Sequence, residues 1–163
     1  MATWSGIRNK LEQEYLADSL RRHIQYYVTT YSKCPDHEGR AAIRLDGKEI
    51  IKGSYFNNWY KAHLFPRDDK YERRMDTEFA YMDDTAIQLG VFDQRCFYDA
   101  FYMFDNQSIE KSLFSENMIV RIFALLDRRV GKRRLLSMKT GIENECETIR
   151  CFYAIRAAAE NVI

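Results

Sequence analysis

The sequence predicts an α+β fold: an N-terminal helix, a three-stranded antiparallel β-meander, and a helical C-terminal half packed on the sheet. Three observations support this prediction. Apolar residues recur every three to four positions near the start, alternate with polar ones between about 22 and 53, and return to helical spacing in the second half. With 46% hydrophobic and 14% aromatic residues, the 163-residue chain has material for one core. We therefore expect a single domain over 1–163, with the helix and meander in 1–54 and mostly helix in 55–163.

The first element is expected to be a helix from about residue 4 to 19. Its apolar positions follow helical spacing and form one stripe, with charged residues between them: Trp4, Ile7, Leu11 and Tyr15. Thr3 precedes the stripe and is a suitable N-cap.

A β-meander is expected to follow. β-branched and aromatic residues dominate the run from 24 to 31, where Tyr26 is expected in the core, and a second alternation covers 41–45. Asp46-Gly47 tolerates the positive φ angles of a two-residue hairpin. The third strand is then expected over about 48–53.

The second half has the features of several short helices. Apolar residues are dense between 85 and 104. Ser108 and Ser115 each precede an acidic and then an apolar residue pattern, as N-caps do. Gly131 separates a further helix at about 132–139, and Gly141 precedes a last one at roughly 142–161.

No targeting or membrane segment is expected. The start of the chain lacks a basic region followed by an apolar stretch, and no apolar run approaches the roughly 18 residues that span a bilayer. We therefore predict a cytoplasmic protein without a membrane partner. Cys34-Pro35-Asp36-His37 is read as a plain turn, because no second cluster completes a metal site. Catalytic residues, metals and cofactors are not expected.

Positive charge is concentrated in Leu126–Leu135, where five cationic side chains surround Gly131 in a chain of net charge +1. One hypothesis is that this basic block contacts nucleic-acid phosphates. The phosphate-contact candidates are Arg128, Lys132, Arg133 and Arg134. A second hypothesis is a solvated face without a partner.

A third hypothesis makes the basic block structural. Asp127 falls near the end of a helix, where the macrodipole disfavours a carboxylate. A fork from Asp127 to Arg129 or Arg133, joining two short helices, would stabilise it. This hypothesis predicts an arginine that is held by the fold.

The aromatic residues on and after the strands supply more apolar surface than a three-stranded sheet covered on one face can bury. Tyr27, Tyr31 and Trp59 are therefore the candidates for an interface. Because two-fold dimers are the commonest oligomers, a homodimer is expected to cover them.

Several blocks, taken together, resemble a family of small bacterial proteins labelled only by a genome locus tag. The similarity covers about two-thirds of the chain, in the same order: Trp4 with Leu11, Leu20 to Tyr26 leading to Val28-Thr29 and Tyr31, Asp46 to Ile50, Ser108-Ile109-Glu110, and Leu126 to Leu135. The family has no assigned activity, substrate or cofactor. The resemblance thus implies a bacterial cytosolic protein and assigns no functional residue.

These observations favour a non-catalytic interaction or accessory module that binds a protein partner the sequence does not identify. The alternative is a nucleic-acid-associated protein that uses the basic block Arg128 to Arg134. A second alternative is an enzyme with its site in the cleft between sheet and helices, around His23 or His63. Phosphate-binding and hydrolase motifs are missing from the sequence, which argues against the usual nucleotide and hydrolase enzymes.

Overall fold

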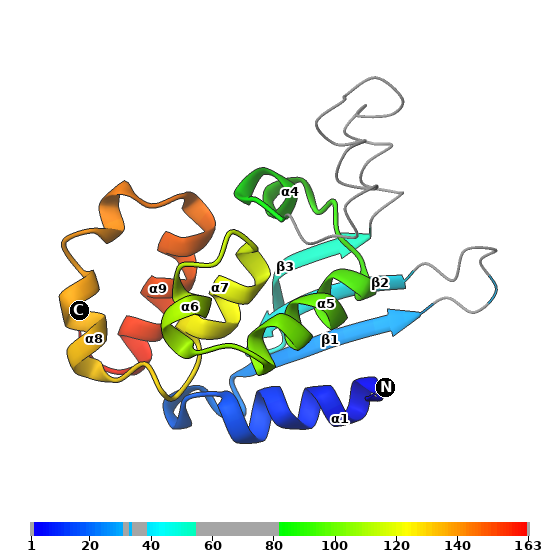
Figure 1. The fold of residues 1–163 in the computed structure, drawn as a ribbon, viewed down its shortest axis with the longest axis horizontal. Coiled ribbons are helices and arrows are strands. Elements are labelled where there is room, and N and C mark those ends of the chain that lie inside the picture. The colour runs from blue at the N-terminus through cyan, green and yellow to red at the C-terminus, as the bar shows by residue number, and fades with distance from the viewer. Residues whose placement is uncertain (1, 31–32, 34–38, 55–81, 163) are drawn as a thin grey trace.

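The structure, a computed structural model, describes residues 2–30, 33, 39–54 and 82–162 (Figure 1). The predicted order of N-terminal helix, three antiparallel strands and helical second half is confirmed. The elements are α1 (Trp4–Asn9), a π-helix η1 (Lys10–Tyr15), a 3-10 turn η2 (Asp18–Leu20), β1 (Ile24–Thr30), β2 (Gly39–Leu45), β3 (Lys48–Ser54), α4 (Asp84–Leu89), α5 (Gln94–Asp105), α6 (Ile109–Leu113), α7 (Met118–Leu125), α8 (Lys132–Met138), a 3-10 turn η3 (Ile142–Asn144) and α9 (Glu147–Ala159).

The N-terminal helix begins as predicted and then changes type. Thr3 Oγ1 accepts a hydrogen bond from the Gly6 N–H at 3.2 Å, which caps α1. The prediction of a single helix over 4–19 is wrong in its second half, because the chain becomes π-helical at Lys10 and leaves the helix at Leu16. Within the π-helix, Glu12 Oε1 accepts the backbone N–H of Tyr26 in β1 at 2.8 Å. This contact closes part of the outer edge of β1.

The three strands form an antiparallel sheet in the order β1-β2-β3. The predicted hairpin is confirmed: Asp46 and Gly47 have φ angles of 50° and 84°, between the paired residues Leu45 and Lys48. The register shifts between Ile43 and Arg44, which leaves β3 with one extra residue.

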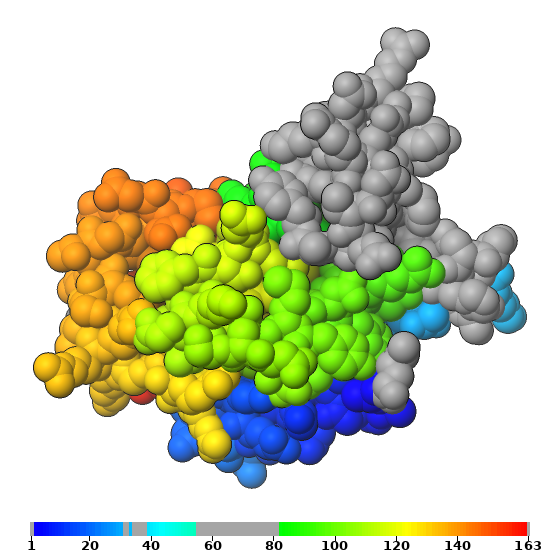
Figure 2. Space-filling view, in the orientation of Figure 1, coloured from blue at the N-terminus to red at the C-terminus, as the bar shows by residue number. Residues whose placement is uncertain are grey.

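Helices α5 and α7 lie over one face of the sheet (Figure 1), and in the space-filling view their atoms lie in front of it (Figure 2). Tyr26 is buried there, as predicted, with its ring centre 5.3 Å from that of Phe123 in an edge-on contact. Phe97 of α5 also meets Phe123 edge-on, at 5.9 Å. Interlocking rings thus join sheet and helices.

The chain returning from α4 passes tightly over the end of β3. A side chain at Gly53 would place its Cβ 2.5 Å from the Phe92 carbonyl oxygen, so only glycine fits. Next to it, the Ser54 N–H donates to the Gly90 carbonyl at 3.3 Å. Residues 90–92 therefore cover residues 53 and 54 of β3 directly.

Two predicted helix boundaries were wrong. Ser108 caps α6 as expected, but α7 begins at Met118 and is capped by Asn117 rather than Ser115. The last helix, expected over about 142–161, is divided because Glu145 and the N-cap Cys146 are extended. The apolar spacing continues across this break, which the periodicity did not detect.

Arg156 on α9 holds the end of α7 and the turn that follows it. The side chain is 2% exposed. Its Nη1 donates to the carbonyls of Leu125 and Asp127 at 2.9 and 2.7 Å, and its Nη2 donates to the Val130 carbonyl at 2.6 Å. One guanidinium thus supplies a donor to the last carbonyl of α7, which lacks an intrahelical donor, and to two carbonyls of the turn that follows.

The Nε of Arg156 extends the network to the N-terminal segment. Arg156 Nε donates to Glu160 at 3.1 Å, and the same carboxylate oxygen accepts the Ser19 hydroxyl at 2.7 Å. The Ser19 hydroxyl and the Arg156 charge hold the pKa of Glu160 below its usual range. The network therefore connects α7, α9 and η2.

Replacing Arg156 with methionine is expected to lower the free energy of unfolding by about 3–5 kcal/mol, because methionine fills the space but donates to none of the three buried carbonyls, of which Asp127 keeps a bond from the Val130 N–H. Urea unfolding measures the loss. Arg150→Met, at an exposed position of the same helix, is the matched control and should change stability by about 0.5 kcal/mol or less. Equal unfolding midpoints for the two variants would show that the network contributes little.

Candidate functional site

The turn between α7 and α8 contains the first predicted site residues. The Asp127 side chain is fully buried and accepts the backbone N–H of Arg129 at 2.6 Å. Arg129 Nη2 donates to the other carboxylate oxygen at 2.8 Å, and the guanidinium lies 5.0 Å from the Tyr15 ring centre. Arg129 is thus held in place, whereas Arg133, the other proposed partner, lies exposed on α8.

The other cations of the basic block are arranged in two ways. Arg134 forms two hydrogen bonds to Glu110 of α6, at 2.6 and 2.7 Å, and this pairing holds the pKa of Glu110 below its usual range. Arg128, Lys132 and Arg133 are exposed. Three of the four phosphate-contact candidates therefore face solvent, and the fourth already binds a carboxylate.

Tyr27, the first interface candidate, lies on the sheet face opposite α5. The guanidiniums of Arg40 and Arg44 lie 5.5 and 4.1 Å from its ring centre. Both arginines bind Glu49, Arg40 with bonds of 2.6 and 3.0 Å. In this sheet-face cluster of Tyr27, Arg40, Arg44 and Glu49, both arginines thus share one carboxylate, which leaves a net positive charge. Tyr31 and Trp59 lie outside the described residues.

Histidine supplies little catalytic machinery in the part of the chain that is described. His23 is exposed at the hairpin end, with its Nδ1 2.6 Å from Asp46 Oδ1. His63 and the Cys34–His37 turn lie outside the described residues. Among the residues the structure describes, no group of three or more His, Cys, Asp or Glu side chains is placed to hold a metal ion.

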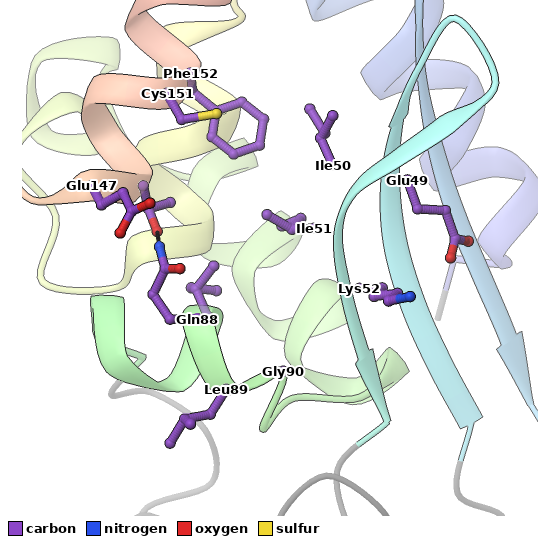
Figure 3. Close-up of a pocket in the computed structure, with 12 residues that line it drawn as sticks. Glu49, Ile50, Ile51, Lys52, Gln88, Leu89, Gly90, Glu147, Cys151 and Phe152 are labelled. Atoms are coloured by element: carbon purple, nitrogen blue, oxygen red, sulfur yellow. Dashed lines mark hydrogen bonds between the residues drawn. The ribbon is translucent and has the colours of Figure 1, made fainter.

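A groove of about 450 Å³ lies between β3, α4 and α9 (Figure 3). We call it the β3 groove. Its lining comes from three elements and the residue after α4: Glu49, Ile50, Ile51, Lys52, Ile87, Gln88, Leu89, Gly90, Glu147, Thr148, Cys151 and Phe152. Sequence reasoning did not find this site.

The extra residue of β3 shapes the strand side of the groove. In a regular strand, neighbouring side chains point to opposite faces. Ile50 and Ile51 instead both point toward α9, while Glu49 and Lys52 point away from the groove (Figure 3). The register shift therefore gives the β3 groove two adjacent apolar side chains.

The helical side of the groove is fixed by hydrogen bonds. Gln88 Nε2 donates to Thr148 Oγ1 at 3.1 Å, and the Thr148 N–H donates to Asp84 at 3.2 Å. These bonds connect α4 to the first turn of α9. Cys151 opens onto the groove, and burial together with the Glu147 charge raises the pKa of its thiol, which disfavours a nucleophilic thiolate.

One sequence signal pointed to this face of α9. Between 151 and 159, apolar residues surround almost the whole helix, whereas a helix packed on one side needs a single stripe. Cys151, Ala154 and Ala158 are exposed as a result. No signal marked the extra residue in β3, because Ile50-Ile51 fits a regular buried strand equally well.

Glu49→Gln is expected to destabilise the protein by about 1 kcal/mol at neutral pH. Hydrogen bonds from Arg40 and then Arg44 lower the pKa of Glu49. A lowered folded-state pKa contributes stability above the unfolded pKa of about 4.3, and this contribution is lost as pH falls through the folded value. The difference in unfolding free energy between wild type and variant should therefore be largest near pH 7 and shrink below about pH 4.

The control for Glu49 is Glu143→Gln, which removes an exposed carboxylate in η3. Its effect on the free energy of unfolding in urea should be close to zero at both about pH 7 and about pH 3. A Glu49→Gln penalty that persists unchanged at pH 3 would show that the ion pair is not its cause.

Three comparisons with known proteins bear on this arrangement. No curated protein and no solved structure matches the chain. Within the described ranges, no helix combines the length and apolar character needed to cross a bilayer. The model of the SF0329 protein family matches residues 3–157, a range that includes the β3 groove, the sheet-face cluster and the basic block. The chain therefore belongs to the SF0329 protein family.

Proposed function

We propose that this protein is a non-catalytic interaction module and that the β3 groove is its docking site for a partner protein. The groove itself carries the proposal: Ile50 and Ile51 of β3 face a helical wall that includes Phe152 and is fixed by hydrogen bonds. Concave apolar sites with a few fixed polar groups are the usual places where proteins bind ligands.

The chemistry of the titratable groups supports binding rather than catalysis. Burial raises the pKa of the thiols of Cys96 and Cys151, which disfavours nucleophilic attack. Burial also raises the pKa of Asp93, but this carboxylate caps α5 by accepting the N–H groups of Arg95 and Cys96. These perturbed groups are thus explained by packing and capping.

The groove is a better docking site than the sheet-face cluster. Arg40, Arg44 and Glu49 already bind one another over Tyr27, so a partner there would compete with bonds the protein makes itself. The resemblance of several sequence blocks to small bacterial proteins supports a bacterial, cytoplasmic setting for this interaction.

The proposal is tested with a displayed library of random linear peptides selected on the wild-type protein. Cys151→Arg places a long charged side chain in the groove from an exposed position. We expect enriched peptides whose Kd rises about tenfold or more with Cys151→Arg, measured by fluorescence anisotropy.

The matched control is Leu136→Arg, which makes the same addition at an exposed position of α8 away from the groove. Peptide affinity should stay within about twofold of wild type. A selection that yields no binders, or binders indifferent to Cys151→Arg, would contradict a docking role for the groove.

A nucleic-acid role for the basic block is the second proposal. It rests on the exposure of Arg128, Lys132 and Arg133 within six residues. Because Arg129 and Arg134 already bind carboxylates, at most about three phosphate contacts are expected. Log affinity for duplex DNA should then fall against log salt with a slope near −3. Arg133→Ala should reduce the magnitude of this slope by about 1, the value of one phosphate contact. A slope near zero would exclude this role.

A further inference from the structure

Within the residues that the structure describes, the two edges of the sheet are closed to different extents. At β1, Glu12 of the π-helix accepts the outward N–H of Tyr26. At β3, the Ser54 N–H binds the Gly90 carbonyl, and residues 90–92 cover the strand end. The remainder of β3, from Glu49 to Lys52, instead lines the groove. An edge strand bordering a groove is a template for pairing with another backbone.

The register identifies which backbone groups face that groove. Alternate residues of a strand direct their N–H and C=O groups to the same edge. Because the Ser54 N–H points outward to Gly90, the backbone groups of Lys52 also point outward. Gly90 already pairs with β3 at Ser54. A chain that enters the groove would thus extend this backbone pairing to Lys52.

The walls of the groove select an extended chain. Helices α4 and α9 stand opposite β3 (Figure 3), so a chain that enters the groove lies between the strand and these helices. Side chains of an added strand would alternate between the groove interior and the outer face of the sheet. The two sets of side chains would therefore meet different surroundings.

The interior set meets apolar side chains and a negative charge. Ile50, Ile51 and Phe152 line the groove, and Glu147 lies at its helical side. These neighbours favour apolar residues and disfavour acidic ones at the interior positions. The outer face has the opposite preference, because Arg40, Arg44 and Lys52 share it with one carboxylate, Glu49. Acidic residues are thus favoured at the outer positions.

We propose that the β3 groove binds an extended segment of a partner protein by strand addition to β3, and that this segment alternates apolar and acidic residues. The inference rests on the proposed function, since it names the partner chemistry of the same groove. Main-chain bonds beside Lys52 hold the segment, and the alternating side chains give specificity.

The probe is a blocked heptapeptide of alternating valine and glutamate. Two versions are methylated on every second backbone nitrogen, in one register or the other. Only one register removes the N–H groups that face β3, so one methylated peptide should lose about tenfold or more in affinity while the other binds like the parent. Bound parent peptide should also slow hydrogen exchange at the Lys52 amide.

Charge is tested by exchange of sign. Lys52→Glu should weaken the valine–glutamate peptide about fivefold and strengthen an alternating valine–lysine peptide by a similar factor. Cys151→Arg should abolish binding of both peptides. Leu136→Arg again serves as the matched control and should change neither affinity.

The outcomes separate this inference from the proposed function. If groove-dependent library peptides bind but methylation in either register is without effect, strand addition is excluded and the groove docks another shape, such as a helix. If strand addition holds but the valine–lysine peptide binds wild type as well as the glutamate peptide, the acidic preference is overturned. If neither library nor designed peptides bind, both proposals fail.

Discussion

The buried guanidinium of Arg156 is the interaction on which the helical half depends. It reaches the carbonyls of Leu125, Asp127 and Val130, and so determines where α7 ends and how the following turn is shaped. Burying a charge to 2% exposure costs folding free energy unless its N–H groups find acceptors. Here the acceptors are backbone carbonyls and the Glu160 carboxylate. The same residue therefore stabilises the fold and limits alternative packings of α9.

The position of α9 has consequences for the rest of the molecule. On one side, Glu160 and Ser19 connect the helix to the N-terminal segment. At its other end, Thr148 binds Asp84 and Gln88 of α4, which places α4 opposite β3. The width of the β3 groove thus depends on contacts at both ends of one helix, although the groove is lined by only part of it.

Sequence reasoning recovered the elements that depend on local pattern. Period-two alternation and the Asp46-Gly47 pair defined the meander, and Thr3 and Ser108 marked helix starts. The helix dipole motivated an arginine partner for Asp127, but the Asp127–Arg129 pair lies within the turn between α7 and α8 rather than joining two helices.

Other features depend on contacts between distant residues. Glu12 meets Tyr26 across elements, Glu110 meets Arg134 across 24 residues, and Arg156 binds carbonyls, which every residue carries. None of these has a local signature. The candidate groove was missed for a related reason: its apolar strand side results from one extra residue in β3, and the pair Ile50-Ile51 fits a regular buried strand equally well.

That extra residue also affects how the hairpin tolerates changes in length. Exposed hairpins usually accept insertions and deletions, because few contacts depend on which face of the sheet their side chains point to. Here the in-and-out alternation of side chains is interrupted at Ile50. The groove keeps two adjacent isoleucines only as long as this interruption is present. A deletion of one residue between Gly47 and Ile51 would restore regular alternation and remove one isoleucine from the groove. The length of this short hairpin is thus constrained in a way that its surface position does not suggest.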